Sequence, residues 1–291
     1  MTSFVQHLAG GLFLGSIYAL VAIGYSLMWS TTKAVNFAHG DSLMLTAVAT
    51  VLLLGAGAPL WLAAGIALAL VAVYGALVHR ALVQPFAGAA NTSGWILATI
   101  ATGVMIEAAV NVLFGSLPRP LPSPAVQSPV TLLGASLYLQ EWIAPLIVLA
   151  IAAFVSLFQR RTLVGRAMRA IAENPDAAGL MGIDARRVAT LTFAASAALG
   201  GVAGLLVAPI IQVQAQMGVL IGLKGFAVAI AAGAGSLWSV VLLGALFGVG
   251  EQFVSAYAGS GFRDAAVFAL VILLLLLRPE GLFGRREVKK V

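Results

Sequence analysis

Long apolar stretches separated by short polar turns make up most of this chain. A helix needs about 20 apolar residues to cross a bilayer, and several of the stretches, notably 42–54 and 225–235, are shorter than that. Short, glycine-interrupted segments are typical of helices that break or pack around a pathway. The pattern predicts an all-α integral membrane protein, a polytopic helical bundle of about 8–9 transmembrane segments with short or broken helices. The stretches lie at residues 5–29, 42–54, 59–79, 93–114, 142–158, 188–211, 225–235, 237–257 and 264–277.

Composition supports a membrane protein and excludes several other classes. Of 291 residues, 61% are hydrophobic and only 9% are charged, whereas a soluble domain has about 25% charged residues. The net charge of +6 does not indicate nucleic-acid binding, because the basic residues cluster in short loops, where they set membrane topology. The chain has no cysteine, so disulfide and thiolate chemistry is excluded.

The basic residues also predict an orientation. If the loop 159–187 is cytoplasmic and the sides alternate from there, the sixteen Lys and Arg divide into thirteen inside and three outside, as positive-inside topology requires. The three outside are Arg119, Lys224 and Arg263. Nine crossings place the N-terminus outside and the C-terminus inside, and a re-entrant short segment would change this parity.

The loop 159–187 contains signals for a short helix of its own. Asn174 is a good N-cap, and Pro175 suits the first helical position, where its missing N–H costs nothing. Asp176 lies where the helix dipole favours an anion, and Gly182 can take the left-handed conformation that ends a helix. A capped helix held between two membrane helices is typical of a docking element for a soluble partner.

Two further patterns concern packing. The loop 115–138 contains five prolines, which exclude a regular helix and predict an extended cover on the outer face, either a connection or a binding element. Small residues also recur four residues apart and let helix backbones approach closely in lipid, within this chain or between two copies. These pairs are Gly11 and Gly15, Gly200 and Gly204, and Gly244 and Gly248.

Polar residues next to apolar segments define the first candidate site, because such groups are costly in a bilayer. Asn36, His39 and Asp41 lie in a turn between the first two segments. They form either a broken-helix element that lines the pathway or an ordinary turn in which Asp41 and Ser42 cap the following helix. His39 alone is more often a packing residue than a ligand or a proton relay.

Three polar residues lie inside later segments. Glu107 and Asn111 are one turn apart in 93–114, and they face either a polar cavity or another helix. Glu251 lies well inside 237–257. A carboxylate that faces lipid costs several kcal/mol, so both acids should face the interior. Each then makes a structural hydrogen bond or contacts the substrate.

The sequence has no motif for bond chemistry. It lacks the G-x-x-x-x-G-K-[ST] phosphate loop, and no Ser/His/Asp arrangement is recognisable. The three histidines, His7, His39 and His79, are far apart in sequence, unlike the ligands of a typical metal site. We therefore expect no catalytic, cofactor or metal site. Transport is the remaining class, and the two glutamates leave ion coupling open.

Five motifs together resemble those of the permeases of branched-chain amino acid ABC importers, of the first of the two permease types. The match runs in order along essentially the whole chain. The motifs are GSIYAL at 15–20, VNFAHGD at 35–41, ENPDAA at 173–178 followed by GID at 182–184, GLKGF at 222–226 with GS at 235–236, and RPEGLFG at 278–284.

This resemblance implies a type II-like importer fold within a single transmembrane permease domain, 1–291, of the bacterial inner membrane. The N-terminus would be periplasmic and the C-terminus cytoplasmic. It also implies four partners: a second, related permease, two cytoplasmic ATPase subunits that bind the ATP, and a periplasmic solute-binding protein. The resemblance places the coupling helix to the ATPase at Glu173, Asn174, Pro175, Asp176, Ala177, Ala178, Gly179, Leu180, Met181 and Gly182. The candidate pathway-lining residues are Tyr18, Asn36, His39, Asp41, Glu107, Asn111 and Glu251.

The expected function is therefore the membrane-spanning permease subunit of an ATP-driven importer, without an ATPase site of its own. Branched-chain or hydrophobic amino acids are the first expectation for the solute. Urea, short amides and aromatic acids are alternatives within the same importer class. An ATP-independent channel or a secondary transporter is the alternative from a different class.

Overall fold

The computed structural model describes residues 2–86, 94–126, 129–132, 135–233 and 237–283. Over these residues the fold is helical apart from one two-stranded hairpin, which confirms the predicted all-α membrane class. Gly235, Ser236, Gly284 and the basic residues after it lie outside the described residues. The helices are α1 (Thr2–Thr32), α2 (His39–Gly55), α3 (Leu60–Val78), α4 (Gly94–Phe114), α5 (Leu139–Arg161), α6 (Leu163–Glu173), α7 (Pro175–Leu180), α8 (Ala185–Ile211), α9 (Met217–Ala232), α10 (Leu237–Tyr257) and α11 (Arg263–Leu277).

Seven of the described helices are long and apolar enough to cross a membrane, and α2 and α9 are shorter apolar helices. Together they agree with the expected 8–9 segments. The second short segment was misplaced, because the structure has it at Met217–Ala232 rather than at 225–235. Lys224 is therefore a buried residue inside α9 and not part of an outer loop. Gly218 and Gly222 lie inside this helix, close to the backbone of Gly40.

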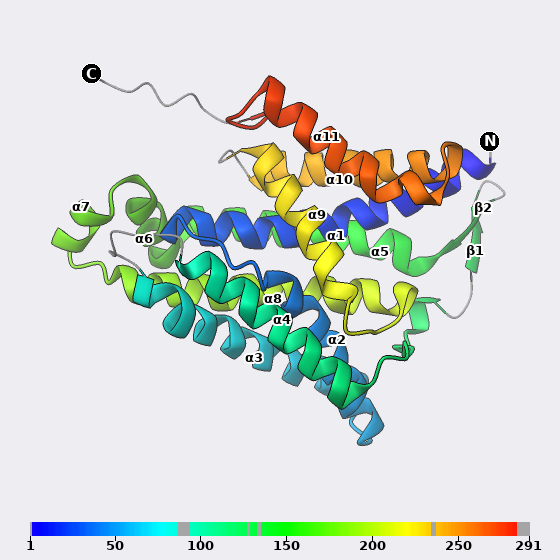
Figure 1. The fold of residues 1–291 in the computed structure, drawn as a ribbon, viewed down its shortest axis with the longest axis horizontal. Helices are drawn as coiled ribbons and strands as arrows, with labels where there is room; N and C mark the ends of the chain where they lie inside the picture. The colour runs from blue at the N-terminus through cyan, green and yellow to red at the C-terminus, as the bar shows by residue number, and fades with distance from the viewer. Residues whose placement is uncertain (1, 87–93, 127–128, 133–134, 234–236, 284–291) are drawn as a thin grey trace. The chain divides into compact units, whose positions relative to one another are not determined.

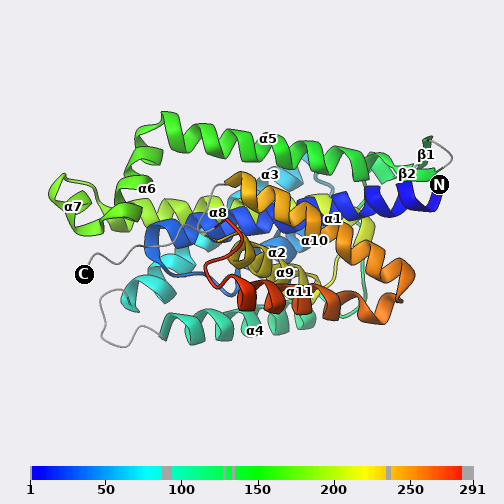
Figure 2. The ribbon, with the colours of Figure 1, turned by 90° about the horizontal axis from the view of Figure 1, so that it is seen from above.

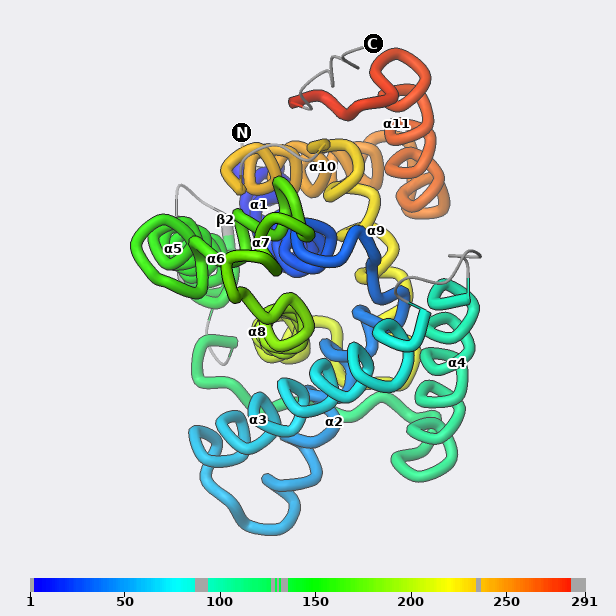
Figure 3. Tube along the Cα trace, turned by 90° about the vertical axis from the view of Figure 1, so that its left-hand side faces the viewer, coloured from blue at the N-terminus to red at the C-terminus, as the bar shows by residue number. Residues whose placement is uncertain are grey.

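The described residues group into two compact units. One unit contains residues 24–123 and 153–223. Within it, α2, α3 and α8 pack against one another (Figure 3). Close contact is possible because small residues lie at the crossings: a side chain at Gly204 would collide with the backbone of Leu43, and one at Gly75 with the backbone of Phe193.

The other unit contains residues 1–23, 124–152 and 224–291. Its α1 crosses α10 through two glycine pairs, since an added side chain at Gly11 or Gly15 would meet the α10 backbone. Gly244 and Gly248 in turn lie against the backbone of α1. The predicted small-residue pairs at these positions therefore pack within this chain.

The proline-rich loop contains no α-helix in its described residues, and part of it forms a hairpin. Strands β1 (Pro129–Leu132) and β2 (Ala135–Tyr138) pair in antiparallel fashion. The hairpin leads directly into α5 (Figure 2). Nearer the start of the loop, Arg119 pairs with Val213 through backbone hydrogen bonds of 2.9 and 2.8 Å.

The α1–α10 crossing gives a prediction with an internal control. Gly248→Ala should lower the free energy of unfolding by about 1–3 kcal/mol, because the new methyl group collides with the backbone at Gly15 and Gly11. Gly250→Ala, two residues along the same helix, has no atom within 4 Å of the new methyl. It should be neutral or stabilising by up to about 1 kcal/mol. Thermal unfolding of the purified protein in detergent measures both, and equal melting temperatures for the two variants would contradict the crossing.

Candidate functional site

The predicted short helix in the loop 159–187 forms at the expected residues. Asn174 accepts a hydrogen bond from the Ala177 amide at 3.0 Å, Pro175 is the first helical residue, and Gly182 has φ +79°. The helix, α7, ends at Leu180, and Met181 is its C-cap residue. It follows α6 directly and precedes α8, as Figure 1 shows.

The surface of α7 is unevenly buried. Ala178 is buried, and its carbonyl accepts hydrogen bonds from the amides of Met181 and Ile183, which close the end of the helix. Leu180 is 91% exposed and Met181 is 83% exposed. Two large apolar side chains at the end of a capped helix therefore have no contact within the chain that removes them from solvent.

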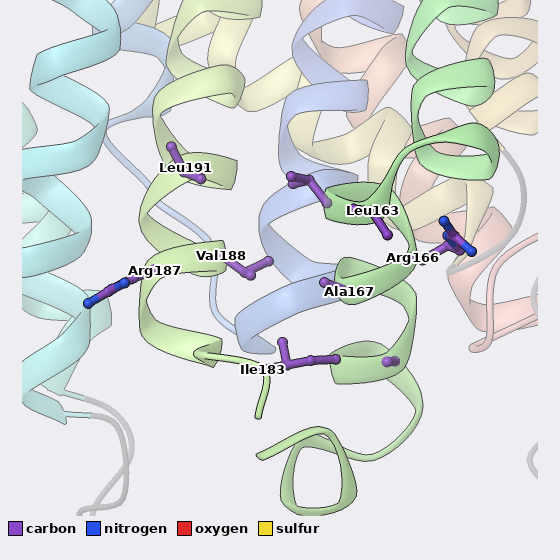
Figure 4. Close-up of a pocket in the computed structure, with 9 residues that line it drawn as sticks. Leu163, Arg166, Ala167, Ile183, Arg187, Val188 and Leu191 are labelled. Atoms are coloured by element: carbon purple, nitrogen blue, oxygen red, sulfur yellow. The ribbon is translucent and has the colours of Figure 1, made fainter. Parts of the chain in front are cut away.

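A groove lies beside α7, where α6 meets the start of α8 (Figure 4). Its volume is about 590 Å³. The side chains around it are mostly apolar, and the two charged ones are Arg166 and Arg187. Arg187 is paired with Asp184 at 2.9 Å, and Asp184 also caps α8 by accepting from the Arg187 amide at 3.1 Å. The lining residues are Leu163, Val164, Arg166, Ala167, Ala170, Ile183, Arg187, Val188 and Leu191.

Two of the candidate pathway residues, Tyr18 and Glu251, come together in the unit that contains α1 and α10. The Tyr18 hydroxyl donates to Glu251 at 2.8 Å, and the Glu251 side chain is 1% exposed. Lys224 of α9 donates to the same carboxylate at 2.8 Å, and Arg263 also pairs with it. Lys224 also bridges to Asp264 at 2.6 Å. Glu251 thus makes the structural contacts that were one of its two expected roles.

Sequence reasoning missed this network because it assigned its cations to loops. Lys224 was assigned to an outer turn, whereas it lies within an apolar helix and points to α10. Asp264 and Arg263 begin α11, immediately beyond the turn that follows α10. The sequence did contain a signal for this network, because residues 217–232 form a continuous apolar segment with a single lysine inside it. A lysine buried in such a helix requires an acidic partner.

The polar turn at the start of α2 forms a second cluster, in the unit that contains α2, α4 and α8. Asn36 is buried, and its side-chain oxygen accepts from the Ala38 amide at 3.0 Å. Helix α2 begins at His39, and no side chain caps it. The expectation that Asp41 and Ser42 cap this helix is therefore wrong, because both already lie within its first turns.

His39 is buried against two other helices of this unit. Its ring makes an edge contact with Tyr25, with the ring centroids 4.7 Å apart. Glycines at 24 and 200 make room for it, since a side chain at either position would contact the imidazole. These contacts agree with a packing role for His39.

Asp41 faces α4 from the first turn of α2. Its Oδ2 lies 3.0 Å from the point where a Cβ on Gly103 would be. Glu107 and Asn111 follow Gly103 at successive four-residue steps, so the three residues share one face of α4. Glu107 interacts electrostatically with Asp41. The structure therefore brings Asp41 and Glu107 into one site, whereas Tyr18 and Glu251 belong to the other unit.

Comparison with known proteins places these elements in a family. Residues 7–277 match the family described as the permease component of branched-chain amino acid transport systems. The chain is 32% identical to LivH, a permease protein of the high-affinity branched-chain amino acid transport system of Escherichia coli K12, over 99% of this chain and 98% of that protein. It is also 32% identical, with the same coverage, to BraD, the corresponding permease protein of Pseudomonas aeruginosa.

A solved structure supports the fold. One chain of PsaBC from Streptococcus pneumoniae, determined in complex with Fab, superposes with a TM-score of 0.50 over 96% of both chains. At 13% sequence identity this likeness concerns the fold alone. The family match and the relatives, which extend over nearly the whole chain, establish that this protein belongs to the permease family of branched-chain amino acid ABC importers.

Proposed function

We propose that this chain is the membrane-spanning subunit through which an ATP-driven importer moves branched-chain or other hydrophobic amino acids. The substrate class rests on the relatives, which are permease proteins of branched-chain amino acid transport systems. Residues 1–291 act as one permease domain, which pairs with a second, related permease to enclose the pathway. The chain binds no ATP itself, because two cytoplasmic ATPase subunits supply that function. A periplasmic binding protein delivers the solute.

The observation that carries the energy-coupling part of the proposal is α7. It is capped at its N-terminus by Asn174 and presents exposed Leu180 and Met181. A short helix that is fixed at both ends moves as a rigid body. Closure of an ATPase dimer that holds α7 therefore moves α6 and α8 with it. The adjacent groove, with Arg166 and Arg187, extends the surface that an ATPase subunit contacts.

The proposed orientation follows from the same element. Loop 159–187 faces the cytoplasm, where the ATPases are, and the loop 115–138 faces the periplasm, where the binding protein docks. The N-terminus is then periplasmic and the C-terminus cytoplasmic in the inner membrane. The polar residues Asn36, Asp41, Glu107 and Asn111 contribute to the pathway, and His39 packs beside them. Tyr18 and Glu251 instead stabilise the subunit through the ion network.

Purification and reconstitution test this function together. A tagged chain, extracted from its native membrane in mild detergent, should recover a second permease and two ATPase subunits, identified by mass spectrometry. In proteoliposomes, this complex should accumulate leucine only when ATP is on the side of the membrane that carries the ATPase subunits. The binding protein must be on the opposite side. Recovery of the chain alone, with solute flux that needs neither ATP nor binding protein, would instead identify an ATP-independent channel.

A further inference from the structure

The two acidic clusters of this chain differ in how their charge is balanced. Glu251 is neutralised by Lys224 and Arg263. Over the described residues, the ion pairs involve Asp184, Glu251 and Asp264, and neither Asp41 nor Glu107 takes part in one. A carboxylate inside a membrane protein normally pairs with a cation or lines a functional path. Over the described residues, Asp41 and Glu107 therefore have no cation beside them that would compensate a negative charge.

The burial of Asp41 makes this imbalance costly. Asp41 is 5% exposed, and its Oδ2 has no hydrogen-bond partner within the described part of the chain. That oxygen lies against α4 at Gly103, where the absence of a side chain allows the carboxylate to approach the helix closely. A buried, unpaired carboxylate oxygen is expensive unless a ligand completes its hydrogen bonding.

The face of α4 that meets Asp41 is polar along its length. Glu107 lies one turn beyond Gly103 and is half-buried. Its charge acts on Asp41, and two like charges at one site repel unless a cation lies between them. Asn111 follows one turn further, and its Oδ1 is also buried without a partner in the described residues. The stripe therefore presents acceptors and no positive charge.

Aromatic side chains complete the surroundings of Asp41. Tyr25 of α1 and Tyr74 of α3 both lie within electrostatic range of its carboxylate. The Tyr74 hydroxyl also donates to the carbonyl of Ala38 at 3.4 Å, at the start of α2. Aromatic rings attract cations, so two tyrosines near the carboxylate are compatible with an ammonium group at this site.

We propose that Asp41 and Glu107 form the binding site for the positively charged amino group of the solute during its passage through this subunit. The inference rests on the proposed function and specifies the part of the substrate that the permease itself recognises. Asp41 accepts hydrogen bonds from the ammonium group, Glu107 supplies the second negative charge, and Asn111 offers a further acceptor along the same face of α4.

The chemistry of the site discriminates between the possible solutes. A zwitterionic amino acid brings the cation that the two carboxylates lack. Urea and short amides are neutral and leave both charges uncompensated, and a carboxylate without an amino group adds a third negative charge. The site therefore favours amino acids over the other solutes that the sequence left open.

The test is the amount of leucine moved per ATP hydrolysed, measured with the complete importer in proteoliposomes. In the double variant Asp41→Asn/Glu107→Gln, leucine uptake should fall about tenfold or more, which corresponds to about 1.4 kcal/mol of lost binding. ATP hydrolysis stimulated by the loaded binding protein should stay within about twofold of the wild type, since α7 and its contacts are unchanged. Uptake that falls without a loss of ATP hydrolysis separates a binding role from a structural one, because a misfolded subunit loses both.

Matched variants control for side-chain shape and for charge removal in general. Glu107→Asp keeps the negative charge on a half-buried side chain, so it should retain more of the leucine uptake than Glu107→Gln does. Glu141→Gln removes a carboxylate at the start of α5 that accepts from the Tyr138 amide, a contact that the amide oxygen of glutamine preserves. Its leucine uptake should equal that of the wild type. If the Asp41 variants do not assemble, Glu107→Gln alone decides, because that half-buried side chain tolerates the change.

Two outcomes would overturn the inference, and a third would overturn the proposed function. Leucine uptake by the double variant at the wild-type rate would remove Asp41 and Glu107 from the site. A requirement of wild-type uptake for Na⁺ or K⁺, absent in the double variant, would place an inorganic cation between the carboxylates instead of the solute. A wild-type complex that hydrolyses ATP but imports no leucine would reject the proposed substrate class.

Discussion

Leu180→Asp should abolish ATP-driven uptake while the membrane subunits still assemble. The Leu180 side chain is 91% exposed, so the substitution breaks no contact within the chain. If α7 enters a groove on an ATPase subunit, a carboxylate at this position must be buried without a partner when the subunits dock. That burial costs several kcal/mol, enough to reduce docking by about a thousandfold. Co-purification of the ATPase subunits and leucine uptake in proteoliposomes measure the effect.

The control for this substitution places the same charge on a different exposed loop. Leu117→Asp introduces the same charge at a similarly exposed leucine in the loop 115–138, which is proposed to lie on the other side of the membrane. The ATPase subunits should still co-purify with this variant. A charge at Ala178 would not serve this purpose, because Ala178 is buried and the charge would disturb α7 itself. Full uptake in Leu180→Asp would show that α7 is not the coupling element.

Glu251→Gln should destabilise the protein by about 3 kcal/mol or more, the usual cost of removing one partner from a buried ion pair. The variant keeps the size of the side chain, but it leaves Lys224 and Arg263 with less negative charge to balance them. For a domain of this size the apparent melting temperature should fall by roughly 6–12 °C. Thermal unfolding in detergent, followed by intrinsic fluorescence, measures the shift.

Neighbouring residues distinguish loss of the network from loss of any charge. Asp264→Asn removes the other carboxylate that Lys224 contacts, but this side chain is 51% exposed, so its loss should cost no more than about 1 kcal/mol. Lys224→Met combined with Glu251→Leu removes both buried charges and should recover part of the stability that Glu251→Gln loses. Equal melting temperatures for Glu251→Gln and the wild type would mean that the pairing at Glu251 contributes little.

The two acidic clusters imply different roles for residues that look alike in the sequence. Glu107 and Glu251 both lie inside apolar helices, and both were expected to face the interior. Glu251 is held by two cations and a tyrosine, so its substitution should lower stability first. Glu107 and Asp41 have no such partners in the described residues, so their substitution should reduce transport while the protein remains folded.

The sequence alone determined most of the local structure. Hydrophobic runs predicted the helices because a bilayer requires about 20 apolar residues per crossing, and those residues are adjacent in the chain. Asn174, Pro175 and Gly182 predicted α7 because capping involves residues a few positions apart. The family motifs occur in order along the chain, and they identified the family that the comparisons then established.

Only the tertiary structure decided which polar residues meet. The distance along the chain from Lys224 to Glu251, or from Asp41 to Glu107, contains no information about contact between helices. The short helix α9 was misplaced for a related reason: its glycines resemble turn signals unless the contact of Gly218 and Gly222 with Gly40 is known. Helix ends are local and could be predicted from neighbouring residues, whereas the balance of buried charge depends on packing between distant segments and required the fold.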